Sequence, residues 1–394
     1  MRRKTRITFL LFLLTMEILL FFYIQTSIVK LNSWSTLRYN ISPTTKPTTN
    51  SQRTRVIIVA HGRSGSSFLA AIFNSHPDFF FIFEPLNIVQ RLVDRLSKDY
   101  LYKAEHVVNS ILNCNFTDDA FLQELSRYSI HRASSRPLVS PPFCKTQYRR
   151  ASDFLSRANW KLCGNGTILA SVLNELCGKH RHIATKILLE RIEPADLTWL
   201  VDNNGSSSVN YVLYLVRDPR AMLHSRSRMG WVVPNERFKQ GLQNGEVDDK
   251  VRKVCDTMEL NLGAVLLEPQ NIKLIRYEEL AANPEAIVRD LFNELRISTS
   301  TDVLQWIHNK THVHGPVKIS PLSLMRQANV SINGWRAKID RQYLQIIETR
   351  CARVLKYLGY IPTQGSQGIL HNLSRPLYLK KMRDLKETYQ WLAL

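Results

Sequence analysis

The chain has 394 residues, 44% of them hydrophobic and 22% charged, and its 53 Lys and Arg against 33 Asp and Glu give a formal net charge of +20. This length exceeds a minimal domain, and the basic balance favours anionic partners without specifying which. Nucleic acid is disfavoured among them, because the sequence contains no recognition-helix or RNA-binding motif.

The N-terminus carries a basic segment followed by an apolar run. Residues 1–6 are rich in Arg and Lys, and the apolar run that begins at Ile7 contains Glu17. A bilayer span needs about 20 apolar residues, and no small-residue cleavage site follows. We therefore expect a cytoplasmic tail (1–6), a transmembrane signal anchor (7–29) and a lumenal remainder; a cleaved signal peptide is the alternative. Residues 30–53, rich in Ser, Thr and Pro, are expected to form a flexible lumenal stem.

Cysteines and glycosylation acceptors agree with an oxidising lumen. The six cysteines form an even set without zinc-site spacing. They allow 15 pairings, among which we expect a local Cys163–Cys177 bridge; a mix of bridges and buried free thiols is the alternative. The N-x-[ST] acceptors are Asn40, Asn115, Asn165, Asn204, Asn309, Asn329 and Asn372.

A strand expected at 55–60 leads into a loop of small residues. β-Branched side chains fill 56–59, the loop 61–67 reads His-Gly-Arg-Ser-Gly-Ser-Ser, and an apolar helical pattern begins at Phe68. Backbone N–H groups and a helix N-terminus make such a unit a cradle for an anion. An ordinary turn rich in Gly and Ser is the alternative.

The loop departs from that of nucleoside triphosphatases, which requires GxxxxGK[ST]. Gly62 and Gly65 are too close together, and no Lys follows. Arg63 lies inside the loop instead, and its planar fork of donors suits a phosphate or a sulfonate.

A very apolar strand-like run, 79–83, ends in Glu84. Burial beside phenylalanines would make this carboxylate a more effective base; an ion pair with Arg63 or a helix cap is the alternative. His61, expected to pack beside the loop, and His76, expected to end the first helix, are weaker candidates. Residues 87–177 are expected to form a mostly helical insertion.

A second cluster follows the strand expected at 211–216. Arg217 comes directly after it, Pro219 suits a helix start, and Ser225 lies about two turns along that helix. Charged residues at the ends of buried parallel strands face the crevice where open α/β sheets bind ligands. Arg217 and Ser225 are thus expected to bind a second phosphate; a solvated basic helix is the alternative.

Further strands at 183–188 and 271–276, with helical patterns between them, predict a parallel α/β sheet flanked by helices. We expect one catalytic domain at 54–362 and a peripheral segment at 363–394. Lys186 could face the site, although an edge or surface position is the alternative.

Two later features are ambiguous. Glu278, between the strand at 271–276 and a helical pattern, is expected to cap or to make structural hydrogen bonds. Trp335 and Arg336 could approach a ligand, with a core Trp and a surface Arg as the alternative.

The two loop motifs, with Phe83-Glu84-Pro85-Leu86 between them, resemble Golgi carbohydrate sulfotransferases, in particular the galactose, N-acetylglucosamine and N-acetylgalactosamine 6-O-sulfotransferases. Arg276-Tyr277-Glu278-Glu279-Leu280, Gly334-Trp335-Arg336 and Leu358-Gly359-Tyr360 extend the resemblance over most of the chain beyond residue 55. It implies a P-loop-like sulfotransferase fold, a Golgi location with a lumenal catalytic domain, and a glycan acceptor.

The resemblance also implies roles for individual residues. The first motif would hold the 5′-phosphosulfate of PAPS (3′-phosphoadenosine 5′-phosphosulfate), and the second its 3′-phosphate. Glu84 would be the catalytic base. Arg63, where many sulfotransferases have Lys, would stabilise charge, because Arg does not usefully give up a proton. The expected PAPS-binding residues are Gly62, Arg63, Ser64, Gly65, Ser66, Ser67, Phe68, Arg217 and Ser225.

Other functions stay open at this point. A lumenal phosphotransferase is disfavoured by the missing loop Lys, and no metal requirement is expected. A protein-tyrosine sulfotransferase would share the PAPS motifs, and an inactive glycan-binding relative would keep the fold. A homodimer is possible.

Overall fold

Five parallel strands form one sheet in the order β2-β3-β1-β4-β5. Their bounds are β1 Arg55–Ala60, β2 Phe79–Phe83, β3 His182–Leu188, β4 Asn210–Val216 and β5 Ile272–Arg276. The computed structural model describes residues 53–127, 130–144, 167–201, 210–312 and 328–379. The parallel sheet and its predicted strands are confirmed, with β3, β4 and β5 each starting within one residue of the expected position.

The alternation of side chains along β1 explains why the sheet has a core on each face. Val56, Ile58 and Ala60 belong to one apolar cluster, whereas Ile57 and Val59 belong to another. Every one of these residues is fully buried, which is the pattern of a central strand covered on both faces.

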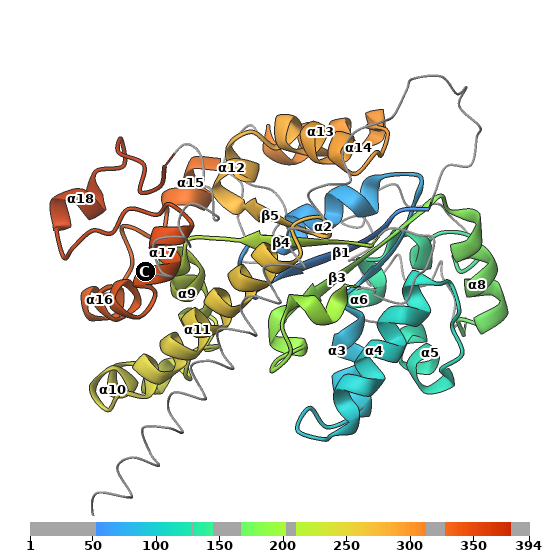
Figure 1. Ribbon diagram of the computed structural model, residues 1–394, viewed down its shortest axis with the longest axis horizontal. Helices are drawn as coiled ribbons and strands as arrows, with labels where there is room; N and C mark the ends of the chain where they lie inside the picture. Colours follow the sequence, from blue (N-terminus) through green and yellow to red (C-terminus); the bar gives the residue numbers. More distant parts are fainter. Residues whose placement is uncertain (1–52, 128–129, 145–166, 202–209, 313–327, 380–394) are drawn as a thin grey trace, which may run out of the picture. The chain divides into compact units, whose positions relative to one another are not determined.

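Helices cover the two faces of the sheet (Figure 1). On one face lie α2 Ser66–Ser75, α12 Tyr277–Ala282, α13 Pro284–Glu294 and α14 Thr301–Thr311. On the other lie α3 Pro85–Leu92, α4 Asp99–Leu112, α5 Asp119–Ser126, α8 Ala170–Lys179 and α11 Glu246–Leu267. Because α2 follows β1 on the first face and α11 follows β4 on the second, the crevice between β1 and β4 is where such a sheet binds ligands.

Shorter elements complete the described part of the chain. They are α6 Ile130–Ala133, α9 Pro219–Ser227, α10 Phe238–Gln243, α15 Ala328–Asn333, α16 Arg341–Arg350, α17 Ala352–Tyr357 and α18 Gln367–His371, with the 3-10 turns η1 Arg136–Val139, η3 Leu189–Arg191, η4 Leu197–Leu200 and η5 Asn235–Arg237. The insertion at 87–177 is mostly helical in its described part, as predicted. Beyond residue 363, Leu370 and Leu377 are buried against Trp335.

Within the described residues, two disulfides join segments that are far apart in sequence. Cys114, just after α4, pairs with Cys177 on α8, and Cys255 on α11 pairs with Cys351, which precedes α17. The predicted Cys163–Cys177 bridge is therefore wrong. The fold brings the Cα atoms of Cys114 and Cys177 to 5.5 Å, and that proximity depends on tertiary structure rather than on spacing in the chain.

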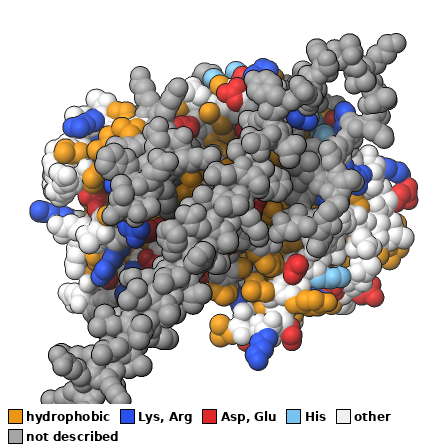
Figure 2. All heavy atoms as spheres, viewed as in Figure 1, with side chains coloured by type: hydrophobic (Ala, Val, Ile, Leu, Met, Phe, Trp, Pro, Cys, Tyr) orange, Lys and Arg blue, Asp and Glu red, His pale blue; other side chains and the backbone are white. Residues whose placement is uncertain are grey.

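The predicted anchor, residues 7–29, and all of the predicted stem except Arg53 lie outside the described residues. None of the helices within the described ranges combines the length and hydropathy needed to cross a bilayer. On the face in view in Figure 2, Lys and Arg side chains are scattered among hydrophobic and acidic ones. The described residues visible on that face thus form no single basic patch.

Candidate functional site

The loop between β1 and α2 has the backbone of an anion cradle. Gly65 occupies the N-cap of α2 with φ 89°, and a Cβ there would lie 2.4 Å from the ring of Tyr277, so glycine is required for both conformation and space. Within the described ranges, no protein acceptor takes the N–H of Gly65, Ser66 or Ser67. These donors are available to an anion at the helix N-terminus.

Not every predicted loop donor is free. Ser64 donates its N–H to the carbonyl of His61 at 3.2 Å and its hydroxyl to the sulfur of Met222 at 3.3 Å. The side chain of Phe68 lies in the apolar core, with its ring 5.6 Å from that of Trp306. The structure thus directs the side chains of Ser64 and Phe68 into the protein.

Glu190, which the sequence analysis missed, fixes the start of the loop. Its carboxylate accepts the N–H of Gly62 at 3.1 and 3.2 Å and the Nη1 of Arg226 at 2.6 Å, and it lies 3.4 Å from Nδ1 of His61. Burial alone would raise the pKa of Glu190, but the hydrogen bond and charge of His61 and the charge of Arg226 hold it well below its usual range. Glu190 lies just after β3, as Arg217 lies just after β4. The position of a charged residue at the end of a strand, which identified Arg217, could therefore also have identified Glu190.

The two predicted phosphate motifs meet between β1 and β4. Arg63 Nε donates to Ser225 Oγ at 3.1 Å, and Arg217 Nη1 donates to the carbonyl of Arg63 at 2.9 Å. Arg217 also donates to the carbonyl of Ser331 at 2.8 Å, and its guanidinium lies 4.7 Å from the ring centroid of Tyr277. Its Nε is buried without a hydrogen-bond partner in the described structure. A buried donor left in this way is costly unless a ligand accepts from it.

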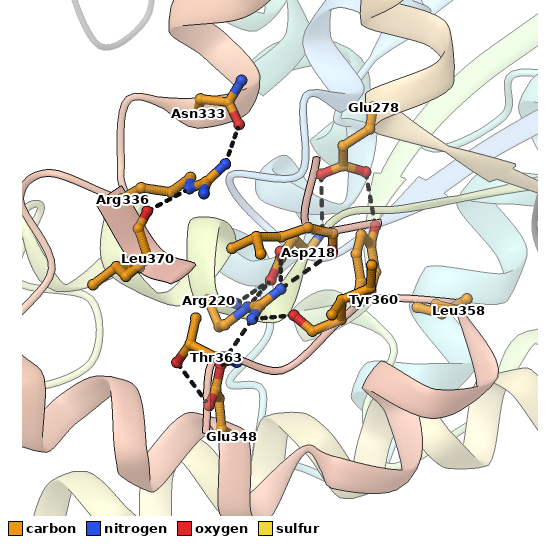
Figure 3. Close-up of polar contacts among 12 residues, drawn as sticks. Asp218, Arg220, Glu278, Asn333, Arg336, Glu348, Leu358, Tyr360, Thr363 and Leu370 are labelled. Carbon is orange, nitrogen blue, oxygen red and sulfur yellow. Dashed lines mark hydrogen bonds and ion pairs between the residues drawn. The ribbon is translucent and has the colours of Figure 1, made fainter. Parts of the chain in front are cut away.

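A network of buried charges holds the turn that carries Arg217 (Figure 3). Asp218 accepts the N–H of Arg220 at 2.9 Å as the cap of α9, and the Arg220 guanidinium at 2.8 Å. Arg220 is fully buried and also donates to Glu348 at 2.8 Å. Because two carboxylates face this guanidinium, its burial is compensated and the turn is fixed.

Glu278 joins the same network from α12. It accepts the N–H of Asp218 at 3.1 Å and the hydroxyl of Tyr360 at 2.7 Å. Burial, followed by the nearby Asp218 carboxylate, raises the pKa of Glu278. The predicted structural role of Glu278 is confirmed.

Trp335 and Arg336 are both structural in this arrangement. Trp335 is 6% exposed and packs with Leu370 and Leu377. Arg336 is 1% exposed and donates to the carbonyls of Leu370 and Ile369 at 2.7 and 2.8 Å. A core Trp was the predicted alternative, but Arg336 is buried rather than on the surface.

Glu84 pairs with Lys186 at the carboxyl ends of β2 and β3. Glu84 has φ 47°, in the left-handed region that disfavours side chains. Its N–H donates to the carbonyl of Lys186 at 3.0 Å, and its Oε1 accepts from Lys186 Nζ. Burial lowers the pKa of Lys186, and the Glu84 carboxylate opposes that shift. Lys186 therefore faces the site rather than an edge or the surface.

The spacing of the strands sets the width of the site. Since β3 lies between β1 and β2, Glu84 and the Arg63 loop stand about two strand spacings, or about 10 Å, apart. Arg63 also has a left-handed φ of 76°. Strained backbone at both residues is typical of functional positions.

Two further features bear on ligand binding. A cavity of about 540 Å³ adjoins the loop, with Phe68, Tyr277, Asn283, His308 and His312 among its lining residues. In the described part of the chain, no group of three or more His, Cys, Asp or Glu side chains could hold a metal ion. His61 is buried beside the loop and His76 follows the last residue of α2, both as predicted.

Comparisons with known proteins point to one family. Human carbohydrate sulfotransferase 6 is 30% identical over 355 residues, which cover 85% of this chain and 87% of that protein. Human carbohydrate sulfotransferase 5 is 29% identical, covering 81% and 80%, and mouse carbohydrate sulfotransferase 1 is 29% identical, covering 79% and 80%. No protein-family profile matches the sequence. Among solved structures, the sulfotransferase domain of the Synechococcus PCC 7002 olefin synthase matches 78% of this chain and 98% of its own, with 14% identity and a TM-score of 0.36.

Proposed function

Because this chain belongs to the carbohydrate sulfotransferase family, we propose that it transfers a sulfuryl group from PAPS to the 6-hydroxyl of galactose, N-acetylglucosamine or N-acetylgalactosamine in a glycan. The chain is a sulfotransferase. The use of PAPS as the donor, the choice of the 6-hydroxyl and the identity of the acceptor sugars are what we propose. The observation that carries the proposal is the convergence of Arg63, Ser225 and Arg217 on one crevice. PAPS carries phosphates on the 3′ and 5′ carbons of one ribose. A site that binds both phosphates needs two cationic groups close together, as Arg63 and Arg217 are.

The residues around the crevice suit such a donor. The N–H groups of Gly65, Ser66 and Ser67 and the guanidinium of Arg63 would bind the 5′-phosphosulfate. Arg217, with its unpaired Nε, and the hydroxyl of Ser225 would bind the 3′-phosphate. The cavity beside Phe68 and Tyr277 has room for the base, since ligand pockets usually span about 300–1,000 Å³.

Glu84 would act on the acceptor. Its carboxylate takes the proton of the sugar hydroxyl, and the ion pair with Lys186 holds that carboxylate in place. When PAPS is bound, a bond from sulfur to the sugar oxygen forms as the bond from sulfur to the phosphate oxygen breaks. Arg63 and the loop N–H groups stabilise the charge that grows on the phosphate oxygen.

The 6-hydroxyl and the three sugars rest on the resemblance of the loop motifs to 6-O-sulfotransferases. The pattern of residues 1–29 supports a single-pass type II membrane protein with a lumenal catalytic domain, and the resemblance to Golgi sulfotransferases supports a Golgi location. A homodimer stays a prediction.

Transfer of labelled sulfate by the full-length chain tests the proposal. PAPS would be offered with keratan-, chondroitin- and mucin-type oligosaccharides and with a tyrosine peptide, and the product analysed by mass spectrometry. We expect label on the 6-position of a glycan. Arg217→Ala should raise the KM for PAPS at least about tenfold, because it removes charged hydrogen bonds. Arg228→Ala, an exposed arginine after the same helix, is the matched control.

Different outcomes identify different errors. Label on the peptide alone would indicate a tyrosine sulfotransferase, and transfer from ATP but not from PAPS a phosphotransferase. An unchanged KM for PAPS in folded Arg217→Ala would remove Arg217 from the donor site.

A further inference from the structure

One large aromatic side chain lies exposed beside the phosphate loop. Trp231 is 48% exposed, although the next two residues, Val232 and Val233, are buried. An indole left half in water loses much of the stabilisation that its burial would give. About half of this side chain is therefore accessible to a ligand.

The indole lies against the part of the loop where the chemistry is proposed to occur. A Cβ added to Gly62 would be 3.1 Å from Cζ3 of Trp231, so the ring closely approaches the backbone at Gly62. The guanidinium of Arg63 lies 5.9 Å from the ring centroid. This distance is at the outer limit of a cation–π contact, so the attraction of Arg63 alone does not account for the position of the ring.

The segment that carries Trp231 is fixed to the loop. Gly230 adopts φ 69° and turns the chain after α9. The backbone N–H of Trp231 then donates to the backbone carbonyl of Arg226 at 3.0 Å. The guanidinium of Arg226 binds Glu190, which also accepts the N–H of Gly62. The segment that carries the indole and the start of the phosphate loop are thus linked through one carboxylate, that of Glu190.

This position suits a sugar ring. A pyranose presents an apolar face of C–H bonds that can lie flat on an indole, while its hydroxyls remain free to bind polar groups. A sugar whose hydroxyl meets a sulfuryl group held by Arg63 stands within a few ångströms of the loop. The indole centroid lies 5.9 Å from the Arg63 guanidinium, so Trp231 is within reach of a sugar ring bound there.

We propose that Trp231 is the platform on which the acceptor sugar stacks, and so a determinant of acceptor affinity. The proposal deepens the proposed function and rests on it for the identity of the acceptor as a glycan. The competing role for Trp231 is to hold Arg63, which would affect the donor rather than the acceptor. The two roles predict different binding constants.

The test compares Trp231→Ala, Trp231→Phe and the unaltered full-length chain. Binding of keratan-, chondroitin- and mucin-type oligosaccharides is measured by calorimetry with the product nucleotide, 3′,5′-adenosine bisphosphate, present, and binding of that nucleotide is measured separately. KM values for both substrates are taken on the same preparations. The matched control is Tyr102→Ala, which removes an aromatic side chain on α4 that is 75% exposed.

We expect Trp231→Ala to weaken acceptor binding and raise the acceptor KM about three- to tenfold, as for loss of one aromatic contact. The affinity of Trp231→Ala for the nucleotide should stay unchanged. The acceptor affinity of Trp231→Phe should lie between those of Trp231→Ala and the unaltered chain, and that of Tyr102→Ala should equal that of the unaltered chain. Unchanged acceptor affinity in folded Trp231→Ala would overturn the platform. Weaker nucleotide binding with normal acceptor binding would also overturn the platform, and would show that Trp231 instead holds Arg63 in place for the donor.

Failure of the proposed function gives a separate result. A chain that binds a glycan through Trp231 but transfers no sulfate would disprove the function and leave the platform intact. A chain that binds none of the glycans would overturn both.

Discussion

The ion pair of Glu84 and Lys186 determines what a substitution at Glu84 can do. The side chain of Lys186 is 2% exposed and that of Glu84 15% exposed. Removing one charge of such a pair leaves the other in a medium of low polarity, at a cost of about 3–5 kcal/mol. A loss of activity in a Glu84 variant must therefore be separated from a loss of folded protein.

We predict that Glu84→Gln lowers kcat about 10²- to 10⁴-fold, because an amide cannot take the proton of the acceptor hydroxyl. Affinity for the product nucleotide should stay near normal, because Glu84 is not expected to touch it. Calorimetry of nucleotide binding and single-turnover sulfate transfer measure the two effects. Glu105→Gln, an exposed glutamate on α4, is the matched control.

The double variant Glu84→Gln/Lys186→Met separates stability from chemistry. It removes both charges, so the free energy of unfolding that Glu84→Gln alone loses should largely return. The sulfate transfer rate should not return. A double variant that regains activity would mean that Glu84 supports the fold and that another group is the base.

At the scale of elements, the unit of β1, loop and α2 depends on the conformation of one glycine. Gly65 combines φ 89° with close approach to the ring of Tyr277 on α12. Tyr277 in turn lies beneath the guanidinium of Arg217. A side chain at Gly65 would therefore disturb the loop and the second phosphate motif together.

We predict that Gly65→Ala lowers the free energy of unfolding by about 1–3 kcal/mol, from backbone strain and the clash with Tyr277. Nucleotide affinity should fall with it. Gly178→Ala is the control: it lies on α8, and nothing in the structure lies within 4 Å of a Cβ there, so the change should be neutral or slightly stabilising. Urea unfolding of both variants measures the difference; equal stabilities would contradict the strain assigned to Gly65.

The sequence predicted elements better than contacts between them. The short apolar runs of β1 and β4 predicted buried strands, because strands covered on both faces of a parallel sheet contain few polar residues. The positions of Arg63 and Arg217 at strand ends predicted a shared crevice. Glu190 could have been identified from its position after β3, but its contacts with the loop and the Cys114–Cys177 bridge depend on how helices and loops pack across the sheet. Neither relation leaves a periodic pattern in the chain.

At the scale of the whole molecule, part of the positive charge is internal. Arg132, Arg220, Arg276 and Arg336 are among the largest fully buried side chains. Each of them donates to at least one backbone carbonyl, as when Arg276 donates to the carbonyl of Leu358 at 2.9 Å. The excess of basic residues in the sequence therefore overstates the charge available to an anionic partner at the surface.

Buried histidines make the stability of the whole chain depend on pH. Burial, as the largest cause, lowers the pKa of His131, His182 and His224 from 6.5 to about 4 each. In the unfolded chain these side chains take up protons near pH 6.5, whereas in the folded chain they do so only near pH 4. Between these values the unfolded state binds more protons, so the free energy of unfolding falls as pH falls. Glu278, with its raised pKa, opposes this trend above about pH 4.5, but it is one group against three.

We predict a progressive loss of stability from pH 6.5 to pH 4.5, measured as the free energy of unfolding in urea at several pH values. His182→Gln should reduce the slope of the free energy of unfolding against pH, by an amount that corresponds to at most about one bound proton. His182 Nδ1 accepts the N–H of Thr54 at 3.3 Å, and the amide oxygen of Gln can replace that acceptor. His371→Gln, at an exposed position, should leave the slope unchanged. A stability that is flat across this range would contradict the lowered pKa values of these histidines. Equal slopes for His182→Gln and the unaltered chain would contradict the contribution of His182.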